Sequence, residues 1–126
     1  MAARTLRLAH RGDWRAAPEN TLAAFAAALA VPACDGLEFD VRVSADGVPV
    51  ICHDATLART HGRSERVDAL TADALETLGV PTLADVLLTA GRGPFLDVEL
   101  KGDPGPRIVE VLAGGRGPGL SNAVVS

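Results

Sequence analysis

The chain has 126 residues, enough for one small domain, and its 48% hydrophobic, 22% charged and 3% aromatic residues are typical of a globular protein. The net charge of −4 argues against a nucleic-acid partner, because nucleic-acid binding usually needs a basic patch. No apolar run approaches the ~20 residues of a membrane span, and the N-terminus lacks a secretory signal pattern, so we expect a cytoplasmic protein. Cys34 and Cys52 form neither a zinc pattern nor a disulfide framework, and we expect both to be reduced and Cys52 to be buried.

Apolar runs separated by Gly, Pro, Asn and Asp predict alternating strands and helices. In chain order we expect a strand at 5–9, a helix at 22–31, a strand at 36–43 with a hairpin extension at 48–52, a polar irregular stretch at 55–70, helices at 71–78 and 82–90, a strand at 95–100, a helix at 104–113 and a strand from 122. Residues 82–85 resemble a capping box, and 103–104 resemble a cap followed by proline at the first helical position. Residues 91–94 and 115–118 are both predicted to be loops between a helix and a strand.

This alternation predicts an α/β fold with parallel strands and helical crossovers. A complete TIM-type (β/α) barrel needs roughly 200 to 250 residues, so a chain of 126 residues supplies about half of one. We therefore expect residues 1–126 to be part of a single barrel domain. A half-barrel leaves a strand edge and an inner face uncovered, so we also expect self-association.

Two carboxylates stand on one face of the strand predicted at 36–43. Glu38 and Asp40 are two residues apart, so both point to the same side, while Leu37, Phe39 and Val41 point to the side that helices would cover. Inward carboxylates repel each other, and a hard divalent cation with oxygen ligands would neutralise them. A solvent-exposed pair on an edge strand is the alternative.

Glu99 repeats this pattern, because it shares one face of the strand at 95–100 with Asp97 and with Lys101 beyond its end. A third carboxylate near the first two fits a calcium or magnesium site. The alternative is a ladder of ion pairs among Asp97, Glu99 and Lys101.

Two histidines, His10 and His53, end apolar runs and stand next to charged residues. Histidine is the usual general acid or base near neutral pH. Asp54 either orients His53 or caps the next segment. The third histidine, His61, lies in a polar stretch and is expected to be solvated only.

The cations of this set are Arg11 and Lys101. Arginine can hold a phosphate with two hydrogen bonds, and lysine acts as a point charge. Three carboxylates, two imidazoles, two cations and one metal ion suit the cleavage of a phosphate ester.

Seven short stretches, in their order and approximate spacing, resemble the glycerophosphodiester phosphodiesterase family. They are residues 9–12, 18–21, 38–41, 46–50, 53–60, 81–83 and 99–101. The resemblance implies the N-terminal half of a TIM-type barrel that cleaves glycerophosphodiesters, such as glycerophosphocholine or glycerophosphoethanolamine, to glycerol 3-phosphate and an alcohol. The roles that it implies are an acid–base pair at His10 and His53, ligands of one divalent cation (Mg²⁺ or Ca²⁺) at Glu38, Asp40 and Glu99, and phosphate contacts at Arg11 and Lys101.

The chain departs from this family pattern in two ways. Residues 55–80 leave room for only a short insertion after the His-Asp motif, which bears on substrate preference, and the second half of the barrel is absent. One alternative is therefore a truncated, non-catalytic fragment that needs a partner half-barrel. Another is a related phosphodiesterase, such as a lysophospholipase D or a phosphatidylinositol phospholipase C.

Overall fold

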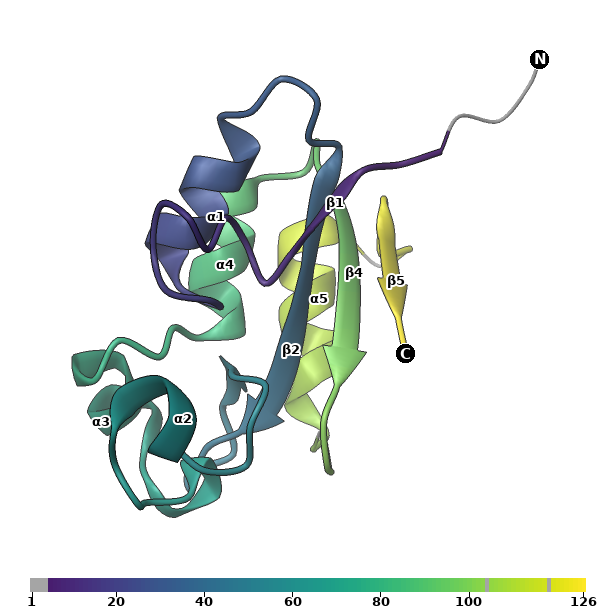
Figure 1. Ribbon diagram of the computed structural model, residues 1–126. Helices are drawn as coiled ribbons and strands as arrows, with labels where there is room; N and C mark the ends of the chain where they lie inside the picture. Colours follow the sequence, from purple (N-terminus) through teal and green to yellow (C-terminus); the bar gives the residue numbers. More distant parts are fainter. Residues whose placement is uncertain (1–4, 104, 118) are drawn as a thin grey trace.

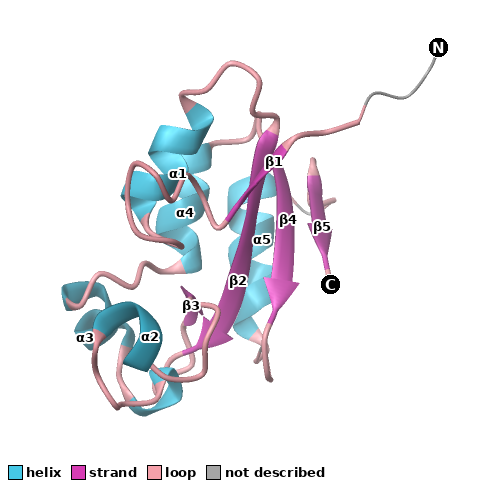
Figure 2. Ribbon diagram, in the orientation of Figure 1, coloured by secondary structure: helices cyan, strands magenta, loops and turns pink. Residues whose placement is uncertain are grey.

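The computed structural model describes residues 5–103, 105–117 and 119–126. It consists of one sheet with helices packed on one face (Figures 1 and 2). The strands are β1 (Leu8–His10), β2 (Gly36–Val43), β3 (Pro49–Ile51), β4 (Phe95–Leu100) and β5 (Ala123–Val125). The helices are α1 (Leu22–Leu29), α2 (Ala58–His61), α3 (Ala72–Thr77), α4 (Leu83–Ala90) and α5 (Arg107–Arg116), with a 3₁₀ turn at Val67–Ala69.

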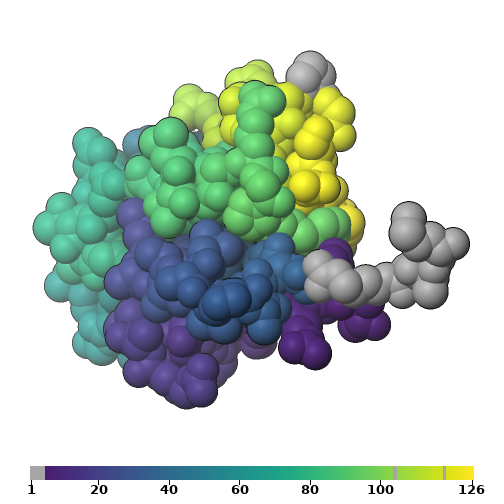
Figure 3. Space-filling view, turned by 90° about the horizontal axis from the view of Figure 1, so that it is seen from above, coloured from purple at the N-terminus to yellow at the C-terminus, as the bar shows by residue number. Residues whose placement is uncertain are grey.

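The sheet order is β1-β2-β4-β5, and every neighbouring pair in this path is parallel. β3 folds back on β2 as an antiparallel hairpin, as predicted from the Asp46–Gly47 turn signal. The connections between parallel strands contain α1, α4 and α5, so the predicted helical crossovers are present. Seen from above, the purple N-terminal and yellow C-terminal segments lie on opposite sides of the blue and green ones, as this strand order requires (Figure 3).

The main core lies between the sheet and α1, α4 and α5. Leu37, Phe39 and Val41 of β2 are fully buried there, as predicted from the alternation of side chains along a strand. The rings of Phe25 and Phe39 meet edge to face at 5.8 Å between centroids, a favourable aromatic geometry. This core holds the strands so that their other face is free to carry the polar residues.

Side-chain caps fix where α1 and α4 begin. The Thr21 hydroxyl accepts a hydrogen bond from the backbone N–H of Ala24 at 3.2 Å. Thr82 and Asp85 form the predicted capping box, with reciprocal hydrogen bonds of 3.1 and 3.2 Å. Each cap satisfies backbone donors that the first helical turn leaves unpaired.

Residues 48–80 build a second, smaller core. Its buried members are Val50, Cys52, Leu57, Val67, Ala72, Leu75 and Val80. Cys34 and Cys52 are free, and Cys52 is buried, as predicted. The prediction of an irregular stretch at 55–70 was wrong, because α2 and the 3₁₀ turn form there to bury Leu57 and Val67. His61, predicted to be only solvated, is half-buried at the end of α2, and this burial lowers its pKa.

The last helix extends further than predicted. Gly115 and Arg116, predicted to be in a loop, belong to α5. Gly115 packs so closely on Leu87 that an added Cβ would lie 2.8 Å from its Cδ1. Arg116 is 1% exposed and donates to the carbonyl oxygen of Ser121 at 3.1 Å. These tertiary contacts stabilise the helix through Gly114 and Gly115, although glycine has a low helix propensity.

Other predicted boundaries differ by a few residues. β1 begins at Leu8 rather than at residue 5, and α1 ends at Leu29 rather than at residue 31. Pro104, predicted as the first helical position, and Pro118 of the predicted loop lie outside the described residues. No helix in the described ranges has the length and apolar character to cross a membrane.

Candidate active site

Three carboxylates converge on the face of the sheet that the helices leave free. β2 carries Glu38 and Asp40 on that face, and the parallel register pairs Asp40 with Glu99 of β4. One oxygen of each side chain lies within 4.8 Å of the other two. The structure therefore brings together the three residues that were predicted to ligate a cation.

Three of the four carboxylate oxygens on β2 lack a hydrogen-bond partner among the described residues. Glu38 and Asp40 are 8% and 0% exposed, whereas Glu99 is partly exposed. Both oxygens of Glu38 and Oδ1 of Asp40 are buried and accept no hydrogen bond from the described residues. Burial, followed by the charges of Asp40 and Glu99, raises the pKa of Glu38 to about 7. A divalent cation with oxygen ligands fits this set, because it would satisfy these oxygens and offset their repulsion.

His10 stands beside the carboxylates at the end of β1. Its Nε2 lies 2.9 Å from Oε2 of Glu38, although the two groups are not aligned as a hydrogen bond. The indole Nε1 of Trp14 donates to the backbone carbonyl of His10 at 2.7 Å, and the two rings are 5.9 Å apart. The imidazole is largely exposed, so a substrate can reach it.

His53 follows β3 and is held by its neighbour. Its Nδ1 lies 2.7 Å from Oδ1 of Asp54. Hydrogen bonds from Arg59, and then from His53, hold the pKa of Asp54 well below its usual range. Asp54 is therefore ionised near neutral pH and can only accept, so Nδ1 of His53 is the donor, and Nε2 makes no hydrogen bond to the described residues. Of the two roles considered for Asp54, the structure supports the orientation of His53.

Arg11 contacts two carboxylates. Its Nη1 donates to Oε2 of Glu19 at 3.2 Å, and its Nε lies 3.2 Å from Oδ2 of Asp40. The guanidinium carbon lies 5.6 Å from the centre of the Trp14 ring. Arg11 is thus adjacent to the carboxylate cluster, where it was expected.

Lys101 is also paired, because its Nζ donates to Oε1 of Glu99 at 2.7 Å. This hydrogen bond lowers the pKa of Glu99, with smaller contributions from His53 and His10. The alternative of an ion-pair ladder is realised for Lys101 and Glu99.

Sequence reasoning missed several polar residues of this region. The stretch 18–21 was interpreted as a helix cap, but only Thr21 caps α1. Asn20 donates from Nδ2 to Oδ2 of Asp40 at 3.1 Å, and Glu19 pairs with Arg11 and with Arg59. The signal that could have found them is the resemblance of residues 18–21 to the family, which a helix cap alone does not explain.

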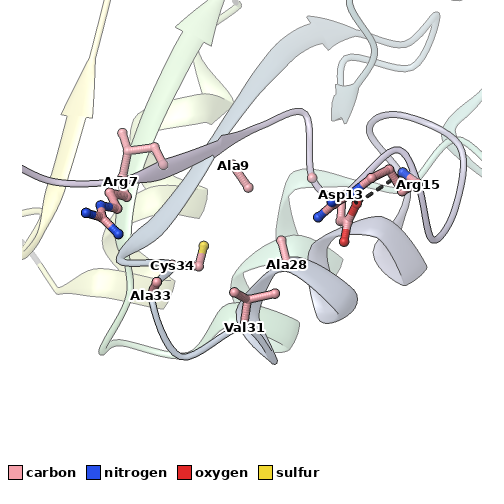
Figure 4. Close-up of a pocket in the computed structure, with 10 residues that line it drawn as sticks. Arg7, Ala9, Asp13, Arg15, Ala28, Val31, Ala33 and Cys34 are labelled. Carbon is pink, nitrogen blue, oxygen red and sulfur yellow. Dashed lines mark hydrogen bonds and ion pairs between the residues drawn. The ribbon is translucent and has the colours of Figure 1, made fainter.

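A separate hollow of about 280 Å³ lies between β1 and α1. Figure 4 shows Arg7, Ala33 and Cys34 at one end of it and the Asp13–Arg15 ion pair at the other, with Ala28 and Val31 from the α1 side between them. None of the seven predicted site residues lines this hollow. The candidate site is therefore the open carboxylate face and not this hollow.

A model of the glycerophosphoryl diester phosphodiesterase family matches residues 10–110 of the chain. A glycerophosphodiester phosphodiesterase of Caldanaerobacter subterraneus subsp. tengcongensis is 43% identical over 75 residues, which are 60% of this chain and 30% of that protein. A probable glycerophosphodiester phosphodiesterase 1 of Mycobacterium tuberculosis is 45% identical over 71 residues, which are 56% of this chain and 26% of that protein.

Solved structures match almost the whole chain. The glycerophosphodiester phosphodiesterase of Thermotoga maritima superposes with a TM-score of 0.86 at 28% identity, over 99% of this chain and 54% of that one. An Oleispira antarctica phosphodiesterase, solved in complex with the product sn-glycerol-3-phosphate, has a TM-score of 0.71 at 29% identity, over 89% of this chain and 53% of that one. The chain thus spans about half the length of these solved relatives, and the predicted α/β half-barrel is confirmed.

Proposed function

Because the chain belongs to the glycerophosphoryl diester phosphodiesterase family, we propose that it serves the cation-dependent hydrolysis of glycerophosphodiesters to glycerol 3-phosphate and an alcohol. The observation that carries the proposal is the cluster of Glu38, Asp40 and Glu99, whose oxygens lie within 4.8 Å of one another. The product complex of the Oleispira relative supports glycerol 3-phosphate as the product.

Glu38, Asp40 and Glu99 hold one divalent cation in this proposal, Mg²⁺ or Ca²⁺, because both prefer oxygen ligands. When bound, the cation offsets negative charge on the phosphoryl oxygens. Arg11 binds the phosphate through its planar guanidinium, and Lys101 contributes a point charge.

His10 and His53 divide the proton transfers. One imidazole takes the proton of the attacking oxygen, which belongs to water or to the glycerol 2-hydroxyl of the substrate. A phosphorus–oxygen bond forms there, and the bond to the departing alcohol breaks as the other imidazole protonates its alkoxide. Attack by the 2-hydroxyl would give a cyclic phosphate, which water then opens. His53 is suited to either role because Asp54 occupies its Nδ1 and leaves Nε2 free.

We further propose that residues 1–126 form the N-terminal part of a single barrel domain. The 54% share of the Thermotoga structure supports this, because the rest of that chain lies outside the matched part. The same observation favours a second candidate, a half-barrel that binds the cation but turns over substrate only with a partner half. β1 and β5 each have one neighbour in the described sheet, so both edges are open to such a partner.

The metal part is tested by calorimetric titration of Mg²⁺ and Ca²⁺ into the chain and into Asp40→Asn. Wild type should bind one cation, and the variant should lose this binding together with any activity. Glycerol 3-phosphate release is measured from glycerophosphocholine and glycerophosphoethanolamine, with and without chelator. Activity that survives saturating chelator refutes cation dependence, and cation binding without turnover favours the second candidate.

The histidine part is tested with His10→Ala, His53→Ala and the matched control His61→Ala, since His61 is half-buried but outside the proposed pair. Each of the first two should lower kcat by about 10²- to 10⁴-fold with cation affinity unchanged. On a nitrophenyl diester, whose leaving group needs no proton, the variant that lacks the general acid should recover. Near-full activity of both variants on glycerophosphocholine would refute the two-histidine mechanism.

A further inference from the structure

Arg59 joins the two segments that carry the proposed catalytic histidines. Its Nε and Nη2 donate to Oδ2 and Oδ1 of Asp54 at 2.9 and 3.0 Å. Its Nη1 and Nη2 donate to Oε1 and Oε2 of Glu19 at 2.5 and 3.1 Å. One guanidinium thus makes two bidentate carboxylate pairs, with residues that are 5 and 40 positions away in the sequence.

Each of these carboxylates contacts a predicted site residue. Asp54 accepts from Nδ1 of His53 at 2.7 Å. Glu19 accepts from Nη1 of Arg11, the residue after His10, at 3.2 Å. The ion pairs therefore run without interruption from His53 through Arg59 to the loop that follows β1.

Arg42 holds the backbone of His53, whereas Asp54 and Arg59 act on its imidazole ring. Arg42 donates from Nε and Nη2 to the carbonyl oxygen of His53 at 3.0 and 2.8 Å. These bonds fix the main chain but leave rotation of the imidazole free. The ring orientation then depends on Asp54, whose own carboxylate has Arg59 on both oxygens.

We propose that Arg59 is a positioning residue, which holds Asp54 so that the His53 imidazole stays in its Nδ1–H tautomer, and holds Glu19 so that Arg11 stays beside the carboxylate cluster. This inference rests on the proposed function of His53 and Arg11. The planar fork of arginine is required, because the two bidentate pairs use four hydrogen bonds and an ammonium group has only three donors. Lysine at this position keeps the charge but loses the two bidentate pairs.

The tautomer is the readout that a purely structural role would not change. Magic-angle-spinning NMR of the ¹⁵N-histidine-labelled chain at pH 8 distinguishes Nδ1–H from Nε2–H imidazoles, whether or not the chain self-associates. Loss of the His53 signals in His53→Gln assigns them among the three histidines. Wild type should show the Nδ1–H form at His53.

The decisive variants are Arg59→Gln and Arg59→Lys, with Arg63→Ala as the matched control. The Arg63 side chain is 47% exposed, compared with 49% for Arg59, and among the described residues its guanidinium pairs with Glu65 rather than with Asp54 or Glu19. The Nδ1–H to Nε2–H ratio of His53 should fall by about tenfold in both Arg59 variants, the equivalent of one charge-assisted hydrogen bond, and should stay unchanged in the control. Circular dichroism confirms that the variants are folded.

Kinetics provide a second arm. Arg59→Gln should lower kcat by about tenfold, because the proton transfer depends on a correctly turned imidazole. Arg59→Gln should cost less in an Asp54→Asn background than in wild type, because the part of its effect that passes through Asp54 is already lost there. An unchanged His53 tautomer in Arg59→Gln, or an equal change in Arg63→Ala, overturns the proposal. A changed tautomer in a chain without turnover supports it and counts only against the proposed function.

Discussion

Replacing Glu38 with Gln should stabilise the metal-free chain while it removes cation binding. Glu38 is 8% exposed, both its oxygens lack hydrogen-bond partners among the described residues, and two further carboxylates lie within 4.8 Å. Glutamine keeps the shape of the side chain but carries no charge. The substitution therefore removes the repulsion between Glu38 and the two other carboxylates, which no metal ion offsets when a chelator is present.

The size of this effect depends on pH in a defined direction. The pKa of Glu38 is raised from 4.5 to about 7, chiefly by burial and then by Asp40 and Glu99. An acid with a raised folded-state pKa destabilises the fold as it ionises, so stability is lost as the pH rises from about 4.5 through about 7. A shift of this size corresponds to about 3 kcal/mol at pH 8.

The assay is urea or thermal unfolding of wild type and Glu38→Gln in the presence of chelator at pH 4.5 and pH 8. The two proteins should be equally stable at pH 4.5, and the variant should be more stable at pH 8, by about 10 °C in Tm. Glu110→Gln, a change of the same chemistry at an exposed position of α5, should have no effect. A variant that is no more stable than wild type at pH 8 would show that the charge of Glu38 is already compensated and would refute this reasoning.

Two further predictions concern packing and assembly. Gly36→Ala should destabilise the chain by at least about 3 kcal/mol in urea unfolding, because the new Cβ would lie 1.8 Å from the backbone oxygen of Phe95. The control Gly93→Ala should be neutral, because an added Cβ there has nothing within 4 Å. Equal stability of the two variants would contradict the tight β2–β4 contact. The chain should sediment as dimers or larger species, because β1 and β5 are the edge strands of the described sheet and Val124 is 50% exposed. Val124→Lys should weaken this association. A sharp monomer peak with cooperative unfolding would contradict the prediction of self-association.

The carboxylate cluster could be predicted from the sequence because two local rules determine it. Side chains alternate along a strand, so Glu38 and Asp40 share a face whatever the rest of the fold does. Parallel strands also end at the same edge of a sheet, which brings Glu99 of β4 next to Asp40. Helical crossovers were predictable for a similar reason, because the caps at Thr21 and Thr82 are local signals.

The arginine contacts and the end of α5 could not be predicted in this way. Arg59 and Glu19 are 40 residues apart, and their meeting depends on the paths of two loops and on two long side chains. The helix through Gly115 depends on its fit against Leu87 of α4, which local helix propensity does not contain. Tertiary contacts determine both the arginine contacts and the end of α5, so local sequence patterns do not predict them.

The ion pairs of the site also determine how cation and phosphate binding relate to each other. The two basic side chains proposed to contact phosphate already lie beside proposed metal ligands. Nε of Arg11 is 3.2 Å from Oδ2 of Asp40, and Nζ of Lys101 is 2.7 Å from Oε1 of Glu99. Without a metal ion these pairs neutralise part of the negative charge of the cluster, although both oxygens of Glu38 lack a hydrogen-bond partner among the described residues. A divalent cation held by Asp40 and Glu99 would take over that neutralisation and would repel the guanidinium and ammonium groups. We infer that cation binding frees Arg11 and Lys101 for the phosphate, so that the cation and the anionic substrate reinforce each other's binding.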